Sequence, residues 1–100
     1  MLDAARQATK FAEGRVRFDL DGDLMFALAT VRLLEIVGEA ARYVSEEFRQ
    51  RTPHIPWKQI AGTRDRLIHG YFEVDLDIVW SIVKDDLPGL IAELDQTVST

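Results

Sequence analysis

The chain lacks cysteine, and this absence excludes a disulfide framework and any metal site built on thiolates. Long apolar runs are also missing, since no stretch of roughly eighteen uncharged apolar residues occurs. The first residues, Met1–Thr9, are amphipathic and lack the continuous apolar region of a signal peptide. We therefore expect a soluble, cytoplasmic protein with no membrane association.

An excess of positive charge is absent as well. The net charge is −5, which argues against a general nucleic-acid coat, because phosphate binding scales with the number of cations presented. The charge is unevenly distributed: residues 1–40 carry −2, residues 41–69 carry +3 and residues 70–100 carry −6. A local phosphate site in the middle of the chain is compatible with this pattern, although ordinary solvated charge explains it equally well.

Strand-like alternation is missing too, whereas apolar residues recur at helical spacing throughout. The pattern predicts an all-α protein, an antiparallel bundle of four to five helices in a single domain over residues 1–100. A chain this short buries only about 60 to 70% of its unfolded surface, so dimerisation is a natural source of further stability. Helices are predicted over Leu2–Glu13, from Leu24 to about Arg51, from Pro56 to Gly70, after Asp75, and again from Leu87.

The longest predicted helix, from Leu24 to Arg51, is not interrupted by proline. One face carries charges of alternating sign, in which Glu39 can pair with Arg42 and Glu46 with Arg49. Apolar residues flank this stripe on both sides, so one flank can face the core and the other a partner. A central helix covered on both sides by its own bundle is an equally good interpretation.

Two features resemble metal sites only superficially. The spacing of Asp19, Asp21 and Asp23 is that of a calcium loop, but Gly22 falls between the carboxylates and no closing glutamate follows. Helix capping by Asp21 or Asp23 is the better interpretation. His54 lies in a proline-bracketed loop without a second ligand at suitable spacing, so we expect an exposed turn residue and no metal site.

The chemically richest stretch is Thr63–Tyr71. Asp65 and His69 are four residues apart and share a helical face, so Asp65 can orient the imidazole and raise its basicity. Arg64 and His69 are five apart, hence roughly 140° apart around a helix. Arg64 must therefore reach around the helix, or its counterpart in a second subunit must complete the site across a symmetric interface. Arg66 adds a further cation nearby.

An arginine beside a histidine, without metal ligands, suits cleavage of an RNA phosphodiester. The histidine would move a proton at the 2′-hydroxyl or the leaving oxygen, while the guanidinium would stabilise the charge that grows on the phosphoryl group. Tyr71 could stack on a base or bind phosphate. Surface ion pairing near a helix C-terminus is the alternative, and spacing alone favours it.

Arg64, His69 and Tyr71 form the pattern R-x4-H-x-Y, and this resembles the signature of HEPN-superfamily proteins of the HepT toxin type. Three flanking blocks resemble the same family in the same order, so the resemblance spans about residues 24–92. These blocks are Leu34–Ala41, Ile55–Gly62 and Tyr71–Trp80.

The resemblance implies a single HEPN domain that forms a symmetric homodimer, in which paired motifs build a composite, metal-independent endoribonuclease site. Arg64 and His69 would be catalytic, Asp65 and Arg66 would support them, and no cofactor would be needed. The protein would be the toxin of a type II/VII-like toxin–antitoxin system. A minimal nucleotidyltransferase would be its antitoxin and would transfer AMP to Tyr71.

Asparagine is also common at the position of Asp65 in that family, and the extra negative charge here would lie near the scissile phosphate. The main alternative function is therefore a non-catalytic nucleotide-binding or interaction module that partners a nucleotidyltransferase. A plain structural helical dimer is a third hypothesis.

Overall fold

The computed structural model describes residues 1–67 and 74–99, and within them it contains helices and no strand, which confirms the all-α prediction. The elements, in chain order, are α1 Leu2–Phe11, α2 Asp19–Gly22, α3 Leu24–Arg42, α4 Glu46–Arg51, α5 Trp57–Ala61, α6 Thr63–Leu67, α7 Leu76–Ser81, the π-helical turn η1 Ile82–Asp86, and α8 Leu87–Ser99. None of the described helices is both long and apolar enough to cross a lipid bilayer.

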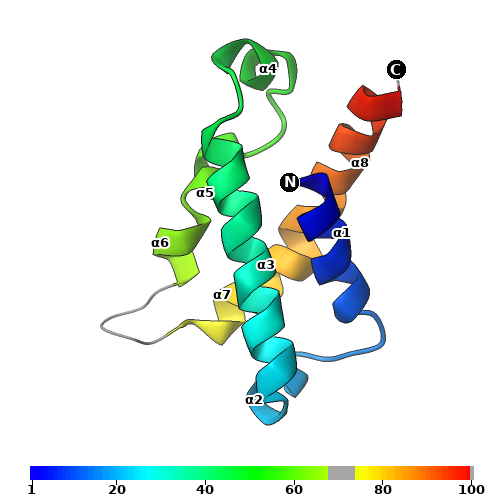
Figure 1. Cartoon of the computed structure of the whole chain (residues 1–100), viewed down its shortest axis with the longest axis vertical. Helices are drawn as coiled ribbons and strands as arrows, with labels where there is room; N and C mark the ends of the chain where they lie inside the picture. Colours follow the sequence, from blue (N-terminus) through cyan, green and yellow to red (C-terminus); the bar gives the residue numbers. More distant parts are fainter. Residues whose placement is uncertain (68–73, 100) are drawn as a thin grey trace.

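The longest helix, α3, runs through the length of the molecule (Figure 1). Figure 1 shows α1 and α8 on one side of it and α5 and α6 on the other, with α2 near its start and α4 beyond its end. Ala5 and Ala8 of α1 are fully buried, and such small side chains allow α1 to approach α3 closely. Leu34 and Val37 of α3 fill the centre of the core. The helix α3 therefore contributes the central core residues and also lies between α1 and α8 on one side and α5 and α6 on the other.

The prediction of one helix from Leu24 to Arg51 is wrong, because α3 ends at Arg42 and a separate helix, α4, begins at Glu46. Ser45 has extended backbone angles and its hydroxyl accepts a hydrogen bond from the Phe48 N–H, so it caps a new helix, α4. The Arg49 guanidinium donates to the Ala41 carbonyl at 2.8 Å, and Arg42 donates to the carbonyl of Ala61. Arg42 and Arg49, which were predicted to pair with glutamates along one face, thus donate hydrogen bonds to backbone carbonyls.

The helix predicted from Pro56 to Gly70 is also divided. It comprises α5 and α6, which meet at Gly62, and the Gly62 N–H donates to the carbonyl of Lys58 at 3.0 Å. The Trp57 indole anchors the start of α5 by donating to the Thr52 hydroxyl at 2.9 Å. The rings of Phe48 and Trp57 pack in an edge-to-face arrangement, with their centroids 5.9 Å apart. These contacts set the direction in which the chain enters α6.

The fresh helix start predicted at Leu87 is replaced by a continuous helical path from α7 through η1 to α8. Pro88 has no N–H to donate to the preceding turn, so a regular α-helix would lack one hydrogen bond there. The π-helical turn η1 lies just before Pro88 and accommodates this missing bond. Of the two capping residues predicted before α3, Asp23 is the one that caps it, because its carboxylate accepts from the Phe26 N–H. The helix predicted after Asp75 is capped by Asp75, which accepts from the N–H groups of Asp77 and Ile78.

Candidate functional site

The helix that carries the start of the motif, α6, is held tightly against α3. A Cβ atom added to Gly38 would lie 3.1 Å from both the Ile60 carbonyl oxygen and the Thr63 Cβ, closer than ordinary contacts. Thr63 is buried, and its hydroxyl donates to the same Ile60 carbonyl at 2.5 Å. The absence of a side chain at Gly38 therefore lets the α5–α6 junction seat on α3. This close approach takes place between elements of one chain.

Arg66 lies on α6 and faces the π-helical turn. Its guanidinium donates to the Asp86 carboxylate at 3.4 Å, and both side chains are more than two-thirds buried. The backbone N–H of Arg66 donates to the Gly62 carbonyl, which closes the first turn of α6. The structure thus gives Arg66 a partner on η1, and this contact ties α6 to the helical path that ends in α8.

The other predicted site residues are only partly described. Asp65 is exposed on α6, where it is accessible to a ligand or to a neighbouring side chain. Arg64 belongs to α6 by its backbone, while its side chain lies outside the description. His69 and Tyr71 lie outside the described residues. The predicted contact between Asp65 and His69 and the roles of Arg64, His69 and Tyr71 therefore stay predictions.

The described residues on either side of the segment 68–73 are bonded to each other. The backbone N–H of Asp75 donates to the Leu67 carbonyl at 2.7 Å, and Leu67 is buried in the core. Asp75 in turn caps α7. The segment that contains the histidine and tyrosine of the motif is therefore bounded by two residues with fixed positions, one on α6 and one at the start of α7.

A pocket of about 270 Å³ lies between α3 and α5, beside the site. Its lining residues include Arg32, Glu35, Glu39 and Arg42 of the charged stripe, with Ile36 and Ala61. The charge pattern of this face did not predict the pocket. Gly38 lies within the stripe, and a glycine there was the available signal that a second element approaches the charged face.

Neither feature that resembled a metal site gathers ligands. Asp23 caps α3, while the Asp21 carboxylate accepts from Arg17 at 2.9 Å. His54 is mostly exposed and contacts the carboxylate of Glu93 on α8. In residues 1–67 and 74–99 no group of three or more histidine and acidic side chains is arranged to hold a metal ion.

Among the described side chains, Asp23 and Arg17 have shifted pKa values, and both lie at the opposite end of α3 from the α5–α6 junction. The pKa of Asp23 is lowered by the hydrogen bond from the Phe26 N–H and by that from the Arg15 guanidinium. The pKa of Arg17 is raised, chiefly because its guanidinium bonds the Asp77 carboxylate at 2.7 Å. These ion pairs fix the α2 end of the molecule and contribute no proton donor or acceptor to the motif.

Comparison with known families gives a match to the one described as "Ribonuclease HepT-like" over residues 1–97. A similar protein of Methanocaldococcus jannaschii, named "Putative RNase MJ1380", is 37% identical over 95% of this chain and 87% of its own length. The "Probable ribonuclease HepT" of Thermococcus cleftensis is 47% identical over 62% of this chain, which corresponds to 56% of that protein. No solved structure matched the chain significantly.

Proposed function

The chain belongs to the HepT-like ribonuclease family, and we propose that it is the metal-independent endoribonuclease toxin of a toxin–antitoxin pair. Membership confirms the enzyme class predicted from the sequence. The observation that carries the finer proposal is the pattern Arg64, His69, Tyr71 within a family match over residues 1–97. The fixed position of α6 against α3 supports it, because a preorganised site needs a rigid base.

In the proposed reaction His69 accepts the proton of the RNA 2′-hydroxyl, and the 2′-oxygen attacks the adjacent phosphorus. The bond to the 5′-oxygen breaks, the leaving oxygen takes up a proton, and a 2′,3′-cyclic phosphate remains on the upstream fragment. Arg64 stabilises the negative charge on the phosphoryl oxygens through paired hydrogen bonds. Asp65 orients the imidazole, while Arg66 is bonded to Asp86 and positions α6.

We further propose that two copies of the chain form the active enzyme. The side chains of Leu24 and Leu28 are 72% and 61% exposed, and Val74, the residue that follows the segment 68–73, is 38% exposed. The three line an apolar hollow of about 390 Å³, together with Leu20, Asp21, Ala27, Val31 and Leu76. Exposed apolar surface of this kind favours a protein partner. A second copy docked here would lie next to the motif segment.

The first test is RNA cleavage by the purified protein in the presence of EDTA. Arg64→Ala and His69→Ala should each reduce cleavage at least about 100-fold, as expected for loss of a catalytic proton carrier or a charge stabiliser. A matched control is Arg32→Ala, which removes an exposed arginine from α3. Full cleavage by the His69→Ala variant would refute the proposed mechanism. RNA or ATP binding without any cleavage would favour the non-catalytic module.

A composite site is tested by mixing the two inactive variants. If Arg64 of one copy acts with His69 of the other, a mixed dimer regains one of its two sites, and random exchange restores about one quarter of wild-type activity. A site contained within one chain would give no recovery. This result separates the geometry of the site from the identity of its residues.

The dimer surface is tested by Leu28→Asp, which places a charge in the apolar hollow. We expect monomers in light scattering and loss of cleavage, because one copy holds only part of the site. Met25→Asp is the matched control, since Met25 is 82% exposed and lines a different hollow. A dimer that survives Leu28→Asp would place the interface elsewhere.

The proposed antitoxin is a minimal nucleotidyltransferase that modifies Tyr71. Intact-mass measurement after co-expression should show the gain of one or more AMP groups, and Tyr71→Phe should abolish the gain. The chain has two tyrosines, so Tyr43→Phe is the natural control. Loss of the added mass in the Tyr43→Phe variant would assign the modification to Tyr43 and not to Tyr71.

A further inference from the structure

An aromatic ring stands in solvent where α3 ends. Tyr43 is 82% exposed, and its backbone N–H donates to the Ala40 carbonyl at 3.1 Å, so the ring projects from an ordered helix end. The chain then turns into α4, which is held to the end of α3 by the bond from Arg49 to Ala41. Tyrosine has only two side-chain torsions, so a ring placed this way loses little entropy when it meets a flat ligand.

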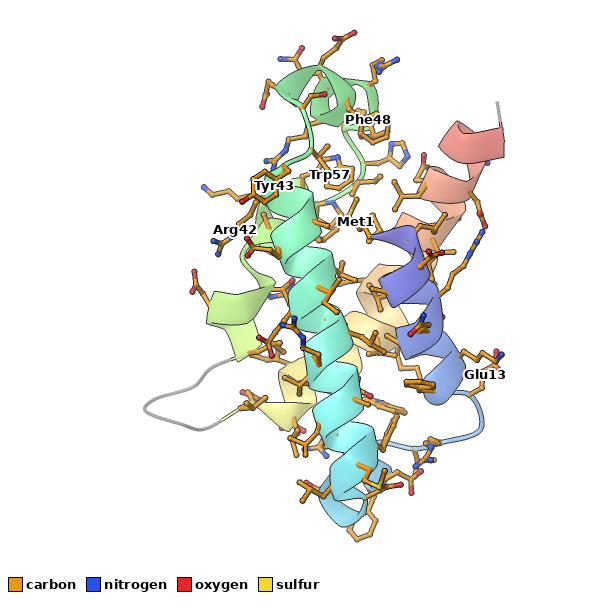
Figure 2. All side chains as sticks on the ribbon, in the orientation of Figure 1. Met1, Glu13, Arg42, Tyr43, Phe48 and Trp57 are labelled. Atoms are coloured by element: carbon orange, nitrogen blue, oxygen red, sulfur yellow. The ribbon has the colours of Figure 1, made fainter. Side chains whose placement is uncertain are left out.

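The residue before Tyr43 is a cation, Arg42. The Arg42 Nε donates to the Ala61 carbonyl at 3.2 Å, which places the guanidinium at the end of α5. Figure 2 shows Arg42 and Tyr43 together at the end of α3 that adjoins α5. The bond to Ala61 uses one of five guanidinium donors. Arg42 therefore links the exposed ring to the point where the chain enters α6.

A second cation comes from α5 itself. Lys58 is exposed, and it belongs to the stretch 41–69, whose net charge is +3 within a chain of net charge −5. Ala61, the carbonyl partner of Arg42, precedes Arg64 by three residues. Arg42 at the end of α3 and Lys58 on α5 therefore both belong to elements that meet near the start of α6, with Arg42 bonded to the last residue of α5.

The 270 Å³ pocket beside Arg42 carries charges of both signs. Glu35 and Glu39 line it, and Arg32 and Arg42 line it too, so two cations balance the two carboxylates. Lys58 is not part of this lining and adds a further cation on α5, which favours phosphate on that side.

We propose that Tyr43, Arg42 and Lys58 form a positioning site for single-stranded RNA, outside the catalytic motif. Tyr43 stacks on a base, and the two cations bind phosphates of the same strand between Tyr43 and α6, so that the strand is led toward Arg64. Exposed aromatic rings between cations are the usual means of holding single strands without sequence preference. This proposal rests on the proposed ribonuclease function and assigns it a binding surface.

The decisive experiment compares cleavage kinetics and RNA binding across a small set of variants. Tyr43→Ala should raise the KM for a single-stranded oligonucleotide roughly 5- to 100-fold, the usual effect of losing one stacked base, and leave kcat unchanged. Tyr43→Phe should restore the wild-type KM, because stacking needs only the ring. Lys58→Gln should weaken binding and flatten its dependence on salt, by a slope of about 0.7 for one phosphate contact on a single strand.

Controls separate this inference from the function on which it rests. Met25→Ala removes an equally exposed apolar side chain elsewhere on the molecule and should leave the KM unchanged. Binding is measured in the His69→Ala background by fluorescence anisotropy, so that substrate is not consumed. Cleavage by the wild type with the same KM in Tyr43→Ala would overturn the positioning site alone. A wild type that neither binds nor cuts RNA would instead overturn the proposed function.

Discussion

The two halves of α3 show how the same helical pattern meets different surroundings. In the first half, Leu24 and Leu28 stay largely exposed on the side of Val74. In the second half, Leu34 and Ala41 are fully buried. All four are apolar residues of one helical pattern, but only the neighbouring elements decide which of them are covered. The exposed half is where we place a second copy, and the covered half is what positions α6.

The sharpest test of this difference replaces one leucine in each half. Leu34→Ala should lower the free energy of unfolding by about 2 to 5 kcal/mol, because it leaves a cavity in the core. Leu28→Ala should change it by no more than about 0.5 kcal/mol in the monomer. Both are measured by urea unfolding in the Leu24→Asp background, which is expected to remove the partner copy. Equal losses would show that the exposed half is already covered within one chain.

A second test concerns the contact that seats α6. Gly38→Val should destabilise the protein by about 1 to 3 kcal/mol, since its side chain would press on the Ile60 carbonyl and on Thr63. It should also lower kcat, because α6 carries Arg64. Gly89→Ala is the matched control: a Cβ at Gly89 meets nothing within 4 Å, and alanine favours a helix. Unchanged kcat in Gly38→Val would separate α6 placement from catalysis.

The predictability of the fold follows the same contrast. Helical class and the caps at Asp23 and Asp75 were predictable, because each depends on residues close in sequence. The break before α4 was not, because Ser45 reads as an ordinary residue inside a long helical pattern. Its cap is stabilised by Arg49, which reaches back to the end of α3, and by packing of Phe48 on Trp57. Such contacts appear only once the chain is folded.

The candidate site was predictable in composition but not in placement. The motif residues stand out from their chemistry and spacing, yet the angle between Arg64 and His69 assumed one helix from Pro56 to Gly70. The helix is divided at Gly62, before either residue, and α6 is described only as far as Leu67, so the angle between Arg64 and His69 stays a prediction. The partner of Arg66 was equally out of reach, because Asp86 is twenty residues away and belongs to a π-helical turn.

A smaller effect is expected for Arg66, and it tests whether this residue acts in catalysis directly or only positions α6. The ion pair with Asp86 should contribute about 0.5 to 1 kcal/mol to stability, measured as the coupling between Arg66→Gln and Asp86→Asn in a double-mutant cycle. If Arg66 acts only by positioning α6, Arg66→Gln should cause no further loss of kcat in the Asp86→Asn background. A further loss there would assign Arg66 a direct role in catalysis.

The smallest expected effect lies at the start of α3, in the pH dependence of its cap. The pKa of Asp23 is held below the ordinary value of 3.8, first by the Phe26 N–H and then by Arg15. A lowered pKa in the folded state means that the cap contributes its full stability above pH 3.8 and loses it as the pH falls further.

Asp23→Asn keeps a capping oxygen but cannot titrate, so its unfolding midpoint should fall less than that of the wild type between pH 5 and pH 2. Asp23→Ala removes the cap as well, and it should already be less stable than Asp23→Asn at pH 7. Parallel pH profiles for the wild type and Asp23→Asn would show that this carboxylate does not stabilise the start of α3 through its charge.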